Sequence, residues 1–321
     1  MPGITDIPGL LAGHATNLEA LTGCTVILCP NGAVAGVDTP GAATASLQHG
    51  VLEPLHSNQR IHAICLSGGS AFGLESAFGV VRFLEKRKIG FSTGAGVVPL
   101  VPAASLYDLG IGKAGVRPDR EMGEKAAAAA SSDPIAEGCV GAGTGATVGK
   151  IHGMAQAMKS GVGSAAVSLD GPFAGVRVAA LAVVNAFGDI IDPESGRIVA
   201  GARAAKKGFE FANTAMLMKR GAAGGFKFEN QNTTLVVVAT NARLNKIEAS
   251  RLARMGSLGM ARSINPVWTN SDGDTVFALS YGDQRADINA VGVAAAEAVA
   301  QAILRAVRLA ASLGGVPGLA G

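Results

Sequence analysis

Aromatic side chains are scarce in this 321-residue chain, which has one Trp, two Tyr and 11 Phe, and charged residues make up only 16% of it. The net charge is +3. A nucleic-acid-binding protein needs a basic surface and, for single strands, aromatic platforms on which bases stack. The densest basic run, 85–88, fits the solvated end of a helix. We therefore expect no nucleic-acid partner.

Cysteine and histidine are too few and too scattered for the common metal sites. The five His residues show no HExxH spacing, and none of the four cysteines forms a CxxC pair. Buried free thiols are typical of proteins in a reducing compartment. We therefore expect no metal, no cofactor and no disulfide framework.

The sequence has no uninterrupted apolar run long enough to span a bilayer. Its longest apolar stretch, 288–311, is broken by five polar or charged side chains. The first nine residues have neither the basic nor the apolar region of a signal peptide. We expect a cytoplasmic protein with no membrane partner.

Apolar residues are abundant at 48%, and 45 glycines supply tight turns, so the chain is expected to fold around a large core. Short apolar runs predict strands, and longer periodic segments predict helices. No linker divides the chain, so we expect a single α/β domain over 1–321, with 190–232 as a long exposed connection. The predicted strands are 24–29 and 33–37 (a hairpin around 30–32), 61–66, 164–169, 176–185, 233–240 and 275–280; the predicted helices are 74–84, 113–136, 246–263 and 288–313.

Two glycine-rich turns are candidate binding loops. The run 141–150 contains the spacing GxGxxG/A, but only a short apolar run precedes it and no acidic residue follows about 20 positions later, which argues against a dinucleotide site. The turn 67–70 lies between a predicted strand and helix but lacks the GxSxG pattern of a nucleophile elbow. Backbone amides in such turns are good oxyanion donors. The candidates for an oxyanion or substrate-pocket role are Gly68, Gly69, Gly143 and Thr144.

The pair Asn232-Thr233 opens a strongly apolar strand directly after the long connection. One interpretation is a strand with a polar start. The other is an autoproteolytic junction, in which the Thr233 hydroxyl attacks the Asn232 carbonyl and water then releases a chain that begins with Thr233. The new α-amino group, with an ordinary pKa of about 7.7–8.0, can act as the base for its own hydroxyl, so no histidine is needed.

The turn Asp272-Gly273-Asp274 precedes another predicted strand. Turn chemistry alone explains these residue types. The two carboxylates are also suited to orient an ammonium group, either the amine of a cleaved Thr233 or that of a substrate.

Seven segments together resemble the self-processing L-aminopeptidase/D-esterase (DmpA-type) family, which includes β-aminopeptidases and nylon-oligomer hydrolases. They occur in the family's order across most of the chain, which makes the resemblance specific although each segment alone is weak. The segments are 66–74 (LSGGSAFGL), 98–104 (VPLVPAA), 141–145 (GAGTG), 159–163 (KSGVG), 185–189 (NAFGD), 232–240 (NTTLVVVAT) and 272–274 (DGD).

The resemblance implies an N-terminal-nucleophile hydrolase with a four-layer αββα sandwich of the DmpA/ornithine acetyltransferase type. It also implies self-cleavage into chains 1–232 and 233–321, which assemble as a tetramer of processed heterodimers acting on a small peptide or amide. By position, Thr233 matches the nucleophile and Asn185 the side-chain oxyanion donor; Thr234 is the alternative nucleophile if the junction lies one residue later. Lys159 matches the lysine of the nylon-oligomer hydrolases, where it would keep the amine neutral; without the family it is a solvated lysine at a helix end.

Asp272 and Asp274 match the acidic pair of the nylon-oligomer hydrolases, and Thr233 in place of Ser favours the same branch. Two other functions remain open from the sequence. One is an acyltransferase of the ornithine acetyltransferase type, in which an amine replaces water as acceptor. The other is an unprocessed, non-enzymatic small-molecule-binding protein.

Overall fold

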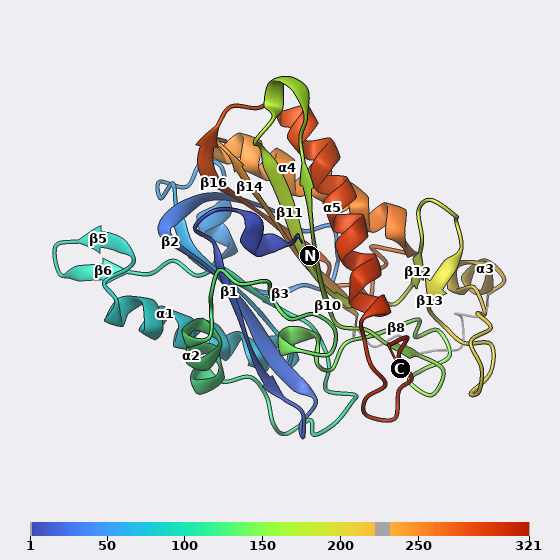
Figure 1. Ribbon diagram of the computed structural model, residues 1–321. Helices are drawn as coiled ribbons and strands as arrows, with labels where there is room; N and C mark the ends of the chain where they lie inside the picture. Colours follow the sequence, from blue (N-terminus) through green and yellow to red (C-terminus); the bar gives the residue numbers. More distant parts are fainter. Residues whose placement is uncertain (1, 222–231, 321) are drawn as a thin grey trace.

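A nine-stranded sheet that folds over on itself forms the centre of the computed structural model, which describes residues 2–221 and 232–320 (Figure 1). Strand pairs are antiparallel except β14 with β16 and β4 with β7, which are parallel. One half contains β10 (Val162–Ser168), β11 (Arg177–Asn185), β14 (Thr233–Ala242), β16 (Thr275–Gln284) and the second part of β2 (Thr22–Asp38). The other contains β1 (Leu11–Asn17), the first part of β2, β4 (Ile61–Ser67), β7 (Ala103–Ser105) and β3 (Ala45–Leu47).

Helices cover both outer faces of this folded sheet, so the layers run helix, sheet, sheet, helix. Helices α4 (Lys246–Ser263) and α5 (Ile288–Arg308) pack on β10, β11, β16 and β2, and α1 (Ser76–Lys86) and α2 (Arg120–Ala128) pack on the β1–β2–β4 side. Three apolar clusters fill the three spaces between the layers. The expected αββα architecture is therefore present.

Strand β14 shows why its sequence is apolar at nearly every position. All ten of its residues are buried, because one face meets the other half of the sheet and the other face meets the helices. Leu235 and Val237 belong to the cluster between the two halves, whereas Val236 and Val238 belong to the cluster beneath α4 and α5.

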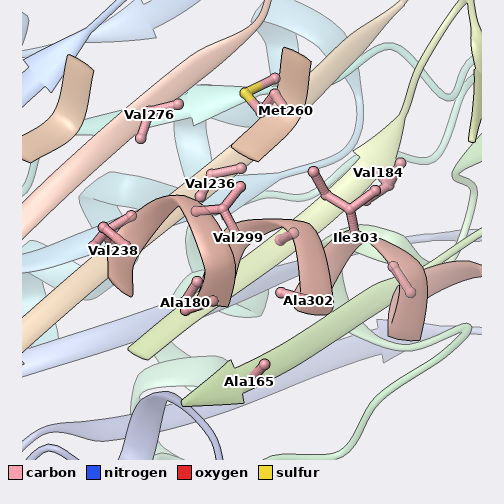
Figure 2. Packing of buried hydrophobic residues seen from close by; sticks show 14 of the residues in the cluster. Ala165, Ala180, Val184, Val236, Val238, Met260, Val276, Val299, Ala302 and Ile303 are labelled. Atoms are coloured by element: carbon pink, nitrogen blue, oxygen red, sulfur yellow. The ribbon is translucent and has the colours of Figure 1, made fainter. Parts of the chain in front are cut away.

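Helix α5 is a core helix. By length and composition alone it could cross a membrane, but 72% of its most apolar window is buried inside the protein. Figure 2 shows Val299 and Ile303 of α5 turned toward strand residues such as Val236. Strand β10 approaches the helix so closely that a Cβ at Gly163 would lie 2.1 Å from the carbonyl oxygen of Ala302. This close packing explains the many small residues of both elements.

Several sequence predictions are corrected. The expected hairpin around 30–32 is not one: β2 runs through this point, pairs with β4 before it and with β16 after it, and so carries the chain from one half of the sheet to the other. The helix expected over 113–136 is shorter in the structure, where only α2 forms. It begins after Asp119, whose side chain caps the helix by accepting from the amide of Met122. Within the segment predicted as a helix over 74–84, only the part from Ser76 belongs to α1, and its Phe78 is 46% exposed.

The remaining elements are short. The expected connection 190–232 is not wholly irregular, since β12 (Asp189–Ile191) pairs with both β13 (Ile198–Ala200) and β15 (Ile264–Asn265); the part 222–231 lies outside the described residues. These elements are η1 (Ile4–Asp6), η2 (His49–Leu52), η3 (Ser70–Glu75), β5 (Phe91–Thr93), β6 (Gly96–Val98), η4 (Gly141–Gly143), β8 (Thr147–Val148), β9 (Met158–Lys159), η5 (Gly171–Phe173), β12 (Asp189–Ile191), β13 (Ile198–Ala200), α3 (Thr214–Lys219) and β15 (Ile264–Asn265).

Candidate functional site

The sheet brings three distant parts of the sequence together at one end of β14. Thr233, the first residue of β14, pairs with Asn185, the last residue of the antiparallel β11. On its other side β14 runs parallel to β16, so the turn 272–274 before β16 lies beside the start of β14. Residues about 40 or more positions apart in the sequence therefore meet where the sequence predicted a site.

The Asn232–Thr233 junction is buried and its carbonyl is hydrogen-bonded. Each of the two residues is 4% exposed. The Thr233 Oγ1 lies 2.5 Å from the Asn232 carbonyl oxygen, and the backbone amide of Gly273 donates to the same oxygen over 2.8 Å. The hydroxyl thus lies beside the carbonyl group that it would attack, and an N–H group polarises that carbonyl.

Glycine at position 273 is required by this close approach. A Cβ there would lie 2.8 Å from Thr233 Oγ1 and 2.5 Å from the carbonyl oxygen of Ala43. The segment around Ala43 runs along the acidic turn, where its amide donates to the carbonyl of Asp272.

The two carboxyl groups of the turn are buried and held by hydrogen bonds. Asp272 Oδ2 accepts from the amide and hydroxyl of Thr269 at 2.8 and 2.7 Å, and Asp274 Oδ1 accepts from the amide of Thr234 at 2.5 Å. Burial raises the pKa of Asp272, and burial together with the neighbouring Asp272 raises the pKa of Asp274 to about 8. Two acids so close together favour a shared proton or a bound cation.

Lys150 supplies a positive charge to this site that the sequence reading missed. Its Nζ donates to Oδ1 of Asn185 over 2.8 Å and to the carbonyl oxygen of Asn185 over 2.9 Å. Burial lowers the pKa of Lys150 to about 7, against the opposing effect of Asp272 and Asp274. The only sequence signal is its place at the end of the glycine-rich run 141–150, where a charged residue follows an almost wholly apolar segment.

Asn185 is fixed by hydrogen bonds on both ends of its amide. Its Oδ1 also accepts from the amide of Thr147 over 3.1 Å, and its Nδ2 donates to the carbonyl oxygen of Tyr107 over 3.0 Å. Donors on one side and an acceptor on the other determine which atom is Oδ1. Tyr107, Thr147 and Lys150 also line a small cavity of about 20 Å³ beside this amide, together with Asp108, Gly110, Ile111, Gly145 and Met154.

The structure excludes one of the two interpretations of Lys159, that of a solvated lysine at a helix end. It is fully buried in β9, not solvated at a helix end, and its Nζ donates to the carbonyl oxygens of Ala146 and Ser160 at 2.7 and 3.0 Å. Burial lowers its pKa to about 8. Among the described residues, the ammonium that contacts Asn185 is that of Lys150. The ammonium of Lys159 instead binds carbonyl oxygens of the neighbouring backbone, including that of Ala146 in the glycine-rich segment.

The four glycine-turn candidates use their amides inside the protein. Gly68 donates to the carbonyl of Gly23 and Gly69 to Oδ1 of Asp108, at 2.9 and 2.7 Å. Gly143 and Thr144 donate within their own turn, to the carbonyls of Val140 and Gly141. All four amides are therefore engaged within the protein.

Within residues 2–221 and 232–320, no group of three or more His, Cys, Asp or Glu side chains is arranged to hold a metal ion. The charged groups that meet here are instead two carboxyls and one amine around a hydroxyl, a carbonyl and an amide. This set is suited to acyl transfer, in which a hydroxyl attacks a carbonyl and N–H donors stabilise the oxyanion.

Comparison with known proteins places this geometry in a family. The model of peptidase family S58 matches residues 3–320. An uncharacterized aminopeptidase of Mycobacterium tuberculosis strain H37Rv is 37% identical over 346 residues, covering 99% of this chain and 96% of the relative. A 6-aminohexanoate-oligomer endohydrolase of a Kocuria species is 32% identical, covering 94% and 85%.

Solved structures agree on the fold. The β-aminopeptidase of a Burkholderia species matches with a TM-score of 0.73 at 22% identity, covering 99% of this chain and 90% of that one. The L-aminopeptidase D-Ala-esterase/amidase of Ochrobactrum anthropi, described as a variant of the N-terminal-nucleophile hydrolase fold, matches with a TM-score of 0.74 at 21% identity, covering 98% and 88%. The chain therefore belongs to peptidase family S58, has the N-terminal-nucleophile hydrolase fold, and is a hydrolase of amide bonds.

Proposed function

We propose that the chain activates itself by cleavage after Asn232 and that Thr233 is the nucleophile of both the self-cleavage and the mature reaction. The observation that carries this proposal is the junction itself, in which the Thr233 hydroxyl lies against the Asn232 carbonyl and Gly273 donates to the carbonyl oxygen. Thr234 does not share this geometry, because its amide is bound to Asp274 and its hydroxyl has no hydrogen-bond partner among the described residues.

Self-cleavage proceeds in two balanced steps. In the first step the Thr233 Oγ1 adds to the carbonyl carbon of Asn232 and forms an ester C–O bond. The C–N bond between the two residues breaks, and the hydroxyl proton passes to the Thr233 nitrogen, which leaves as an amine. Water then hydrolyses the ester and yields a chain ending at Asn232 and a chain beginning at Thr233. The Gly273 amide stabilises the oxyanion of the first step.

In the mature enzyme the free amine of Thr233 accepts the hydroxyl proton as Oγ1 attacks a substrate amide. Lys150 and Thr147 bind Oδ1 of Asn185 and thereby direct its Nδ2 toward the carbonyl oxygen of Tyr107. The Asn185 amide in this position supports an oxyanion role. The amine product leaves, and water hydrolyses the acyl-enzyme.

The buried carboxyls support a role in binding a cationic amine. Asp274 contacts the amide of Thr234, next to the nitrogen that self-cleavage would free, so it is placed to orient the Thr233 ammonium. The substrate class that we propose is a small peptide or linear amide, in line with relatives that act on 6-aminohexanoate oligomers.

Turnover of the linear 6-aminohexanoate trimer, with and without hydroxylamine, tests this function. We expect release of free acid in buffer, and a hydroxamate when hydroxylamine competes with water for the acyl-enzyme. Activity only in the presence of an amine acceptor would instead identify an acyltransferase. Absence of turnover and of any acyl adduct on the chain that begins at Thr233 would contradict the proposal.

A further inference from the structure

A groove of about 580 Å³ lies outside the site just described, between the loop 203–206 and the C-terminal turn 312–317. The residues that line it include Arg203, Lys206 and Ala155. Neither the sequence motifs nor the proposed reaction uses these residues.

Arg203 is a buried cation that no carboxylate neutralises within the described parts of the chain. It is only 6% exposed; its Nη1 donates to the carbonyl of Lys206 over 2.6 Å and its Nη2 to the carbonyl of Ala155 over 2.9 Å. Its buried Nε has no hydrogen-bond partner there. Buried charges are normally paired, so this guanidinium favours an anion in the groove.

Lys206 and the backbone amides of the C-terminal turn add further donors to the groove, beside the Ser312 hydroxyl, which accepts from the amide of Gly318. Lys206 is exposed and makes no ion pair with a described acidic residue. Leu313 and Val316 close a tight turn by mutual hydrogen bonds, and the amides of Gly314 and Gly315 at its tip donate to no acceptor in residues 2–221 and 232–320. A guanidinium, an ammonium and free amides together match a carboxylate.

The groove and the small cavity beside Lys150 are lined by adjacent residues of one loop. Met154 lines the small cavity with Lys150, and the next residue, Ala155, lines the groove. Met154 packs in the same apolar cluster as Leu313 and Val316 of the groove wall. An extended substrate bound beside Asn185 therefore has this groove as a neighbouring region along the same loop.

We propose that the groove binds the terminal carboxylate of a linear amide substrate whose scissile bond lies at Thr233. The orientation of the substrate in this assignment rests on the proposed function. The preference for a carboxylate rests only on Arg203, Lys206 and the turn amides. It gives the enzyme a means of preferring short chains with a free acid end over the same chains without one.

The test measures binding separately from turnover. In the full-length Thr233→Ala chain, calorimetry compares the 6-aminohexanoate trimer with its C-terminal carboxamide, which lacks only the charge. We expect the acid to bind about tenfold more tightly, as for loss of one charge-assisted contact. Lys206→Gln should abolish the difference, while Lys207→Gln, an exposed neighbour outside the groove, should keep it. Arg203→Gln should act like Lys206→Gln if its thermal unfolding shows that it still folds.

Two results would overturn the assignment. One is equal or undetectable binding of acid and carboxamide, and the other is a preference that survives Lys206→Gln. A separate small acid is the other possible source of the carboxylate, and hexanoate is the probe for it. If hexanoate binds in a Lys206-dependent way while the acid and carboxamide trimers bind equally well, the groove holds a separate small acid and not the end of the substrate. Absence of trimer hydrolysis by the wild-type enzyme would count against the proposed function but would leave this binding comparison intact.

Discussion

The Lys150 ammonium lies 2.8 Å from Oδ1 of Asn185, at the end of the strand that pairs with Thr233. We expect Lys150→Met to lower kcat/KM of the processed enzyme at least about tenfold, because the Asn185 amide loses a charged partner that orients it.

Lys159→Met is the matched comparison for this lysine. Its ammonium binds carbonyls behind the cavity, so the variant should lose about 1–3 kcal/mol of stability while keeping most of its kcat/KM. Steady-state kinetics and thermal unfolding of both variants separate the two roles. A larger loss of kcat/KM in Lys159→Met than in Lys150→Met would show that Lys159, and not Lys150, serves the reaction.

Gly273→Ala should slow self-cleavage strongly without unfolding the protein. Its Cβ would press on Thr233 Oγ1 and on the Ala43 carbonyl, which displaces both the hydroxyl and the Gly273 amide from the junction. We expect the cleavage rate to fall about 100-fold, the scale for loss of an oxyanion donor. Gly94→Ala is the control, since a Cβ there meets no atom within 4 Å. Cleavage of Gly273→Ala at the wild-type rate would refute this role of the amide.

The stability of the uncleaved chain should depend on pH through Asp274. The folded carboxyl keeps its proton up to about pH 8, because burial and Asp272 raise its pKa, whereas the unfolded one loses it near its ordinary pKa of about 3.9. Stability should therefore fall as pH rises between these two values. Lys150 acts in the opposite sense, because burial lowers its folded pKa to about 7 from an ordinary value of about 10.4. Between these two pH values it makes stability rise with pH, so part of the stability lost through Asp274 is recovered.

The measurement is the melting temperature of Thr233→Ala between pH 4 and 10, with and without Asp274→Asn. The Asn variant should flatten the fall between pH 4 and 8, because it has no proton to lose. An unchanged slope would mean that Asp274 is ionised in the folded chain.

Asp189 should stabilise the segment that leads to the cleavage junction. Its carboxylate accepts from the amide of Ala202 and from the amide and hydroxyl of Thr214, all within 2.8 Å, and it is 1% exposed. We expect Asp189→Ala to cost about 3 kcal/mol, because buried donors lose their acceptor. Asp192→Ala, which removes a partly exposed ion pair with Arg308, should cost under about 1 kcal/mol. Equal losses of unfolding free energy in the two variants would contradict this account.

The sequence predicted the central strands well because their apolar runs report burial on both faces. The expected 233–240 and 246–263 correspond closely to β14 and to α4 (Lys246–Ser263). It failed at 30–32, where Pro-Asn-Gly favours a hairpin locally but pairing with β4 and β16 carries the strand onward. Such a change of partner depends on distant strands that local sequence does not encode.

For the site, sequence resemblance pointed to Asn232-Thr233, Asn185 and the acidic turn, and the sheet register brings these residues together. It did not identify Lys150, because lysine is common and its burial follows from the fold of the glycine-rich loop. The carbonyl partners of Lys159 and the engaged amides of Gly68 and Gly69 are likewise tertiary contacts.

The central claim is that Thr233 cuts its own chain, and the intact mass of freshly purified protein under denaturing conditions tests it most directly. Wild type and Thr234→Ala should each give two fragments, 1–232 and 233–321, and Thr233→Ala should give one full-length chain with a folded circular dichroism spectrum. A wild-type chain that stays whole after prolonged incubation, or a Thr233→Ala chain that is still cut after Asn232, would contradict the account.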